Sequence, residues 1–300
     1  MDTKLTVISK TGEIKALVIN SLASSESKRS YNKALDDFLT WYEQRGKPGL
    51  SRAIVQEFQA VMLERGLSAG TVNLRLCAIR KLADEAAKNG LIDSVMAAGI
   101  KDIKGVKQSG ARVGTWLNKQ QAEAVVAAPI DKEKVRLIDI RNRAILAVMI
   151  GGGLRRSEVA DLTFEHLYLI ENRWAIVDLI GKGNRTRTVP IPAWTKTAID
   201  KWSEGAGINS GLVFRSITKG GKISDSMSDQ AIADISYKYA GIAAHNLRRT
   251  FSKLAHKGGA ALEQIQLTLG HASIKTTERY LGIEQDLTSA PCDFLGLKLQ

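Results

Sequence analysis

The sequence has few cysteines and no long hydrophobic run. Its 300 residues contain two cysteines, Cys77 and Cys292, which are too far apart to form a motif and too few for a disulfide framework. The longest uncharged apolar run, Ala144–Leu154, covers 11 residues and is too short to span a bilayer. Residues 1–20 carry charges throughout, so no secretory signal is predicted. We therefore expect a cytoplasmic protein without a membrane partner.

Motifs for nucleotides, metals and hydrolytic triads are also missing. The glycine clusters at 151–153 and 181–183 fit neither a Walker loop nor a dinucleotide fingerprint. None of the four histidines has companion ligands at zinc spacing, and no serine or cysteine triad motif occurs. We expect any enzyme built on this sequence to need no cofactor and no metal.

The charge balance points to a polyanionic partner. Lys and Arg number 43 against 31 Asp and Glu, which gives a net charge of +12 and a pI near 9.7. Residues 1–112 and 113–300 each carry +6, so both halves are basic. This pattern favours nucleic acid gripped by two lobes over one basic tail. The glycine-containing basic segment 101–112 is the best linker candidate, and we predict domains at 1–107 and 115–300 with a linker at 108–114.

Apolar periodicity predicts a helical first lobe. Three helices are expected, the second and third capped by Ser51 and Ser68. The stripe of the first helix consists of Tyr31, Leu35, Phe38, Leu39 and Tyr42.

The second lobe mixes helices and strands. A helix over Lys134–Ile150 is followed by strands at Trp174–Ile180 and Thr186–Pro190, which flank a glycine-containing hairpin turn. From Ala193 onward helices are predicted, interrupted by a short strand at Leu212–Phe214. The predicted fold class is therefore mainly α with a small β-sheet (α+β).

Four polar islands in the second lobe carry the functional signal. They are Gly-Leu-Arg-Arg-Ser-Glu at 153–158, Gly-Lys-Gly-Asn-Arg-Thr-Arg at 181–187, His-Asn-Leu-Arg at 245–248, and Leu-Gly-His at 269–271 followed by Thr-Glu-Arg-Tyr at 277–280. Each island alone is weak evidence, but their order is specific. Together they resemble the tyrosine recombinase (phage integrase) family over residues 115–300, and the first lobe resembles that family's helical, SAM-like core-binding domain.

The resemblance implies a site that holds the scissile phosphate. Arg155 and Arg248 match the two arginines that clamp it, and a guanidinium makes two charge-assisted bonds to an anion. His245 would add a donor or a base, and His271 would hold a phosphate oxygen or brace the site. Glu158, one helical turn from Arg155, would orient a catalytic group.

The resemblance also implies the groups that break and form bonds. Lys182, on the hairpin turn, matches the general acid that protonates the 5′ oxygen. Tyr280 matches the nucleophile, whose attack gives a 3′-phosphotyrosyl bond that conserves the energy of the ester.

Further basic residues are candidates for phosphate contacts outside the catalytic set, although a solvated surface is the usual role of such side chains. They are Arg75, Arg80 and Lys81 in the first lobe, and Arg185, Arg187 and Arg249 in the second.

The implied function is site-specific recombination of double-stranded DNA through a Holliday junction, in DNA integration, excision or resolution. The resemblance favours the compact, two-domain kind, a homotetramer on DNA and a nucleoid-associated location. The apolar tail, Leu281–Gln300, would pack against a neighbouring subunit or fold back on its own domain. Two alternatives stay open: a type IB topoisomerase that relaxes DNA, and a DNA-binding protein without catalysis.

Overall fold

The structure is a computed structural model that describes residues 3–107, 115–131, 133–181 and 185–281. The side chains of residues 3–11, 279 and 280 are not described. The chain divides into two compact units, Met1–Ala111 and Arg112–Gln300. The predicted linker, Lys182 and the apolar tail after residue 281 lie outside the described residues, so the domain boundaries at 107 and 115 stay predictions.

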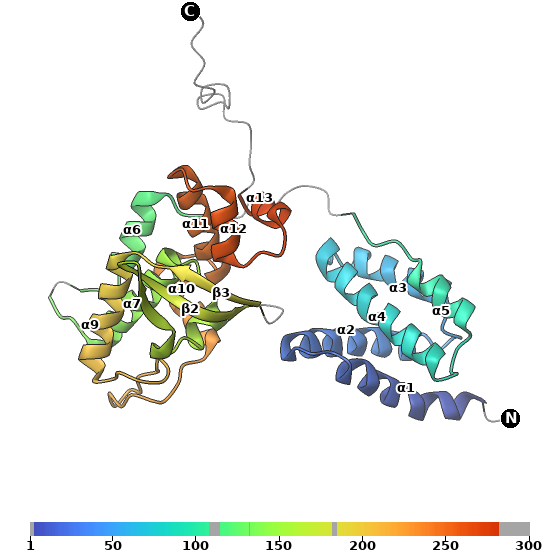
Figure 1. Cartoon of the computed structure of the whole chain (residues 1–300). Helices are drawn as coiled ribbons and strands as arrows, with labels where there is room; N and C mark the ends of the chain where they lie inside the picture. Colours follow the sequence, from blue (N-terminus) through green and yellow to red (C-terminus); the bar gives the residue numbers. More distant parts are fainter. Residues whose placement is uncertain (1–2, 108–114, 132, 182–184, 282–300) are drawn as a thin grey trace, which may run out of the picture. The chain divides into compact units, whose positions relative to one another are not determined.

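The first unit is a helical bundle (Figure 1). Its buried core is mostly aliphatic and includes the aromatic residues Phe38, Trp41 and Phe58. Ser51 and Ser68 cap two of its helices, as the sequence predicts, by accepting hydrogen bonds from backbone N–H groups three residues on. Phe38 and Phe58 are buried with ring centroids 5.2 Å apart. Two helices, α1 and α5, were not predicted. The helices are α1 Thr3–Asn20, α2 Ser25–Gln44, α3 Arg52–Glu64, α4 Ala69–Lys88 and α5 Ser94–Lys101.

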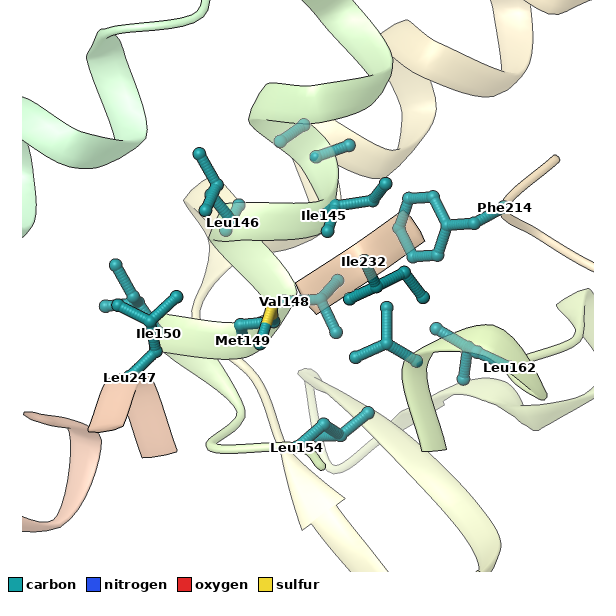
Figure 2. Packing of buried hydrophobic residues seen from close by; sticks show 14 of the residues in the cluster. Ile145, Leu146, Val148, Met149, Ile150, Leu154, Leu162, Phe214, Ile232 and Leu247 are labelled. Carbon is teal, nitrogen blue, oxygen red and sulfur yellow. The ribbon is translucent and has the colours of Figure 1, made fainter. Parts of the chain in front are cut away.

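The second unit is built around the helix that contains most of the longest apolar run. Eleven of the 15 residues of α7 (Leu137–Gly151) are buried. This helix contacts five others: α6 (Lys119–Ala127), α8 (Arg156–Ala160), α9 (Ala193–Ala206), α10 (Asp229–Ala240) and α11 (Ala244–Lys257). In Figure 2 its side chains pack against Leu154, Leu162, Phe214 and Ile232. Its second half, residues 144–151, is apolar on all sides, and such a segment is stable in water only when neighbours cover it. Among the described residues, none of the helices is long and apolar enough to cross a bilayer.

A small antiparallel sheet lies beside these helices, in the order β1-β2-β3. The mainly helical class with a small sheet is confirmed, and so is the hairpin of β2 and β3. The predicted strand at Leu212–Phe214 is wrong: within it, only Leu212 forms an isolated bridge, to Thr163. The remaining elements are α6 Lys119–Ala127, α8 Arg156–Ala160, η1 Phe164–His166, β1 Leu167–Ile170, β2 Arg173–Gly181, β3 Arg185–Pro190, α9 Ala193–Ala206, α10 Asp229–Ala240, α11 Ala244–Lys257, α12 Leu262–Leu269 and α13 Ile274–Leu281.

The glycine cluster that follows α7 is explained by close packing. A Cβ atom on Gly151 would collide with the hydroxyl of Thr195 on α9. Gly153 has a φ of +62°, and a Cβ there would lie 2.6 Å from the ring of Phe251 on α11. Only glycine combines this backbone conformation with this contact. The cluster therefore lets α9 and α11 approach the turn that leads to Arg155.

Candidate active site

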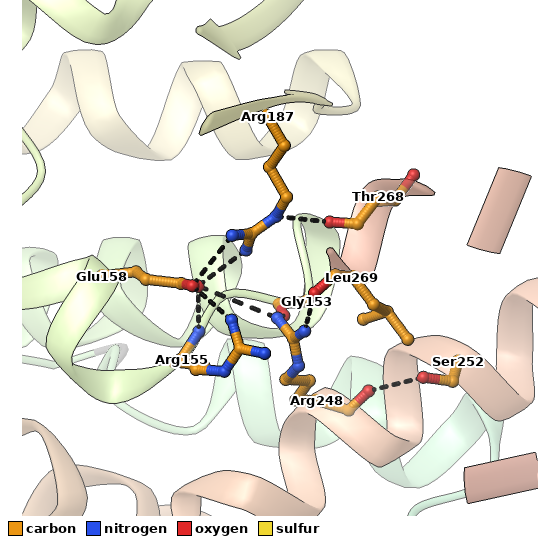
Figure 3. Close-up of polar contacts among 8 residues, drawn as sticks. All are labelled: Gly153, Arg155, Glu158, Arg187, Arg248, Ser252, Thr268 and Leu269. Atoms are coloured by element: carbon orange, nitrogen blue, oxygen red, sulfur yellow. Dashed lines mark hydrogen bonds and ion pairs between the residues drawn. The ribbon is translucent and has the colours of Figure 1, made fainter. Parts of the chain in front are cut away.

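Three arginines surround the carboxylate of Glu158 (Figure 3). Glu158 lies on α8 with its side chain 3% exposed. Its oxygens accept hydrogen bonds from the backbone N–H of Arg155 at 2.8 Å and from Nη1 of Arg155 at 2.6 Å. The two Nη atoms of Arg187 donate to the same carboxylate at 2.9 and 2.8 Å, and Nη1 of Arg248 lies 3.8 Å from it. One buried anion thus orients three cations.

The charges of this cluster do not cancel. Burial by itself raises the pKa of the Glu158 carboxyl, but hydrogen bonds from Arg187 and from the Arg155 backbone outweigh burial, helped by the charges of Arg187 and Arg248. The pKa of Glu158 therefore lies below its ordinary value and the group is ionised at neutral pH. One carboxylate among three guanidiniums leaves an excess of positive charge, which is the condition for binding an anion such as phosphate.

The guanidinium of Arg248 is held by two backbone carbonyls. Arg248 projects from α11 with its side chain 1% exposed. It donates through Nη1 to the carbonyl of Gly153 at 2.7 Å and through Nη2 to the carbonyl of Leu269 (Figure 3). These contacts join α11 to the turn before α8 and to the end of α12. Three of the four islands of the sequence therefore meet at one side chain.

His271 lies against the helix that carries Tyr280. It follows Gly270, which ends α12 in the left-handed conformation at φ +63°. Its Nδ1 lies 2.9 Å from the hydroxyl of Thr277, a fully buried residue of α13, three positions before Tyr280. Partial burial lowers the pKa of His271 to about 4, assisted by the charges of Arg248 and Arg155. The imidazole is therefore neutral at physiological pH.

His245 lies at the start of α11, one helical turn before Arg248. The residue retains exposed surface, and partial desolvation of its ring is the main cause that lowers its pKa. The cationic side chains of Arg248, Arg249 and Arg155 lower the pKa further. Burial and the neighbouring cations thus both disfavour the protonated form of His245, and its imidazole is held in the neutral form.

The basic residues that are predicted to contact DNA outside the catalytic set lie in different environments. Arg75 is 14% exposed and pairs with Asp37 at 2.9 Å, and Arg80 donates to the carbonyl of Ile103. Arg185 is exposed on β3, whereas Lys81 and Arg249 are partly buried. Arg187 faces inward: its side chain is 7% exposed and its guanidinium is bonded to Glu158 and Thr268, so its contact with DNA stays a prediction.

The structure thus brings together Arg155, Glu158, Arg248 and His271, with His245 on the same helix as Arg248. Lys182 and the side chain of Tyr280 lie outside the described residues. Among the described residues no group of three or more His, Cys, Asp and Glu side chains is placed to hold a metal. Sequence reasoning missed the contacts of Arg187 and Thr277, although both residues belong to islands that it had singled out.

Comparison with known families agrees with this architecture. The model of the phage integrase family matches residues 115–286, and that of the phage integrase N-terminal SAM-like domain matches residues 14–90. The chain therefore belongs to the phage integrase family, the tyrosine recombinases, which cleave and rejoin DNA.

Individual relatives support the same class. The chain is 27% identical over 267 residues to the tyrosine recombinase XerC of Xylella fastidiosa (strain M23), covering 87% of both chains. It is 26% identical over 283 residues to the tyrosine recombinase XerD of Pseudomonas aeruginosa, covering 89% of this chain and 90% of the other. Both relatives are tyrosine recombinases, the class to which the family match assigns this chain.

Solved structures share the fold. The XerH site-specific recombinase bound to palindromic difH substrate matches with a TM-score of 0.68 and 23% identity, covering 85% of this chain and 76% of the other. The Tn1549 transposon integrase bound to circular intermediate DNA matches with a TM-score of 0.69 and 17% identity, covering 94% of this chain and 98% of the other.

Proposed function

We propose that this chain cuts and rejoins double-stranded DNA at a specific recombination site through a covalent bond to Tyr280. The observation that carries the proposal is the cationic cluster around Glu158, with His271 hydrogen-bonded to the helix of Tyr280. In this proposal the cationic cluster binds the phosphate, and the neighbouring helix supplies the nucleophile. The tyrosine recombinases that the chain resembles support the same reaction.

In this proposal Arg155 and Arg248 bind the nonbridging oxygens of the scissile phosphate. Negative charge builds up on these oxygens in the transition state, and preorganised donors stabilise it without reorganising at the moment of reaction. Glu158 does not touch DNA and fixes the directions of the guanidiniums. His271, with Nδ1 at the hydroxyl of Thr277, would present Nε2 to one of the same two oxygens.

The proposed chemical step exchanges one ester for another. The phenol oxygen of Tyr280 forms a bond to phosphorus and passes its proton to a base, for which His245 is the candidate. The bond from phosphorus to the 5′ oxygen breaks, and Lys182 donates the proton that this oxygen needs. The 3′-phosphotyrosyl ester retains the energy of the original bond, so a 5′ hydroxyl from another duplex can reverse the step without a cofactor.

Recombination also requires an assembly. Exchange between two duplexes uses four cleavages, so we propose a homotetramer on DNA that passes through a Holliday junction. The tail Leu281–Gln300 is the candidate segment for contact with a neighbouring subunit. Integration, excision or resolution of a mobile element is the proposed use, acting on nucleoid DNA in the cytoplasm.

The proposal is tested with a suicide substrate that contains the recombination site. The site is sought in the DNA flanking the gene, as paired inverted repeats around a short spacer. A nick near the scissile phosphate lets the freed strand diffuse away, so a covalent protein–DNA adduct accumulates. We expect an adduct with the wild type and with the control Tyr237→Phe, an exposed tyrosine on α10.

Tyr280→Phe should bind the same DNA and give no adduct. A covalent adduct with Tyr280→Phe would remove this residue from the role of nucleophile. Relaxation of supercoiled DNA that lacks the site, without joining of two sites, would favour a topoisomerase. Binding without any adduct from the wild type would favour a non-catalytic protein.

A further inference from the structure

We infer that Arg187 is a positioning residue for the phosphate clamp: through Glu158 it fixes the directions of Arg155 and Arg248. This inference rests on the proposed function. It assigns to Arg187 a role inside the protein in place of the DNA contact that its charge predicts.

The guanidinium of Arg187 links the sheet to two helices. Arg187 lies on β3, paired with Leu179 of β2, and its side chain points into the cluster in Figure 3. Nε donates to the carbonyl of Thr268 on α12 at 2.8 Å, and both Nη atoms donate to Glu158 on α8. All three nitrogens of the guanidinium are thus bonded within the protein. The planar fork sets both the position and the rotation of the carboxylate.

Two glycines from the sequence islands leave the space that Arg187 occupies. A Cβ atom on Gly181 would lie 2.8 Å from Nη1 of Arg187, and one on Gly270 would lie 2.9 Å from its Cδ. Both distances are shorter than a Cβ tolerates. The first glycine of the Gly-Lys-Gly island and the glycine of Leu-Gly-His therefore make room for the same side chain.

The contacts explain how Arg187 acts on residues that it does not bind. Oε1 of Glu158 is shared by Nη1 of Arg187 and Nη1 of Arg155. Oε2 accepts from Nη2 of Arg187 and from the Arg155 backbone, and Arg248 approaches the same oxygen. Without Arg187 the carboxylate loses its bidentate partner and can rotate toward Arg155. The guanidiniums then lose the fixed spacing that a tetrahedral arrangement of oxygens requires.

The test measures adduct formation at saturating DNA with Arg187→Gln and Arg187→Lys. Misplacing a catalytic group by about 1 Å costs on the order of 100-fold in rate, and we expect a loss of about that size with an unchanged affinity for DNA. Lysine retains the charge and cannot form the bidentate pair, so it should not restore the rate. Arg173→Gln, an exposed arginine at the start of β2, is the matched control and should behave as the wild type.

A second substrate separates positioning from general damage to the fold. A neutral methylphosphonate at the scissile position removes one charged oxygen that the clamp must hold. The deficit of Arg187→Gln and Arg187→Lys, relative to the wild type on the same DNA, should shrink several-fold on this substrate. Equal deficits on both substrates would overturn the inference, because a merely structural defect does not depend on the charge of the phosphate.

Two further outcomes would also overturn it. A weaker affinity with a smaller salt dependence would show a direct phosphate contact. A wild-type rate for Arg187→Gln would show that Arg187 has no positioning role. The proposed function would still stand in that case, provided that the wild type forms the adduct and Tyr280→Phe does not. Failure of the wild type to form any adduct would contradict the proposed function itself.

Discussion

The Nδ1 atom of His271 and the hydroxyl of Thr277 lie 2.9 Å apart in the described part of the catalytic unit. Thr277 is fully buried on α13, and His271 stands just after α12. In the neutral imidazole one ring nitrogen carries the proton, and the Thr277 hydroxyl can donate to Nδ1 in one tautomer or accept from it in the other. In either tautomer this hydrogen bond orients the ring of His271 and joins it to the helix of Tyr280.

Thr277→Val is expected to slow adduct formation about 10-fold or more and to leave DNA affinity unchanged. Valine has the shape of threonine and lacks the hydroxyl, so His271 loses its orienting partner. Thr277→Ser should restore most of the rate. The control is Thr276→Val, an exposed neighbour on the same helix. Equal rates for the two valine variants would rule out the hydrogen bond as a determinant of the rate.

Arg155→Ala is expected to raise the activation free energy of cleavage by about 3–4 kcal/mol. The measurement is the cleavage rate at saturating DNA. Binding should fall only slightly, because many other phosphate contacts remain. Arg156→Ala is the control, since this adjacent arginine is exposed and pairs with Asp229 at 3.0 Å. Equal losses of binding and cleavage in Arg155→Ala would show that Arg155 merely holds the DNA.

Stability is expected to fall as the pH drops from about 6.5 toward 4. The pKa of His271 is about 4 in the folded chain and near 6.5 in the unfolded chain, so only the unfolded state takes up the proton in this window. Protonation therefore favours unfolding, and the lowered pKa of His245 acts in the same direction. Urea unfolding of the full chain at pH 5 and pH 7.5 measures the change. In His271→Gln the difference between the two pH values should be smaller; an unchanged difference would contradict this assignment.

Cleavage is expected to proceed normally in excess EDTA. The guanidiniums around Glu158 already supply the positive charge that a metal ion gives in other phosphoryl transfers. The measurement is the rate of adduct formation after dialysis against the chelator, compared with the rate in added Mg²⁺. Strong inhibition that Mg²⁺ reverses would refute the metal-free mechanism.

Gly153→Ala is expected to destabilise the chain more than Gly241→Ala. Both glycines have positive φ values, +62° and +65°, so alanine costs about 1–2 kcal/mol at either position. Of the two positions, only Gly153 has a close neighbour for the new Cβ, the half-buried Phe251 ring, and this contact adds about 1–3 kcal/mol of overpacking. Thermal unfolding of the two variants measures the difference. Equal shifts would show that the ring moves away without cost.

Much of the architecture could be predicted from short segments. Helical periodicity and the serine caps located helices of the first unit, since these signals act within a few residues. The prediction of a strand at Leu212–Phe214 was wrong because three consecutive apolar residues do not show whether a partner strand is available. In the structure Val213 and Phe214 are buried in the helical core.

The sequence by itself determined the family, the set of reactive residue types and their order. Each island is a local pattern that can be recognised without knowing which residues lie near it in the fold. Only the tertiary structure decided which basic residues face inward. Arg185 and Arg187 have the same charge and lie two positions apart on one strand, so no local pattern separates them. Arg187 is buried because Glu158 and Thr268, 29 and 81 positions away, converge on its guanidinium. Such a site depends on the packing of α8 and α12 against the sheet, which no single segment encodes.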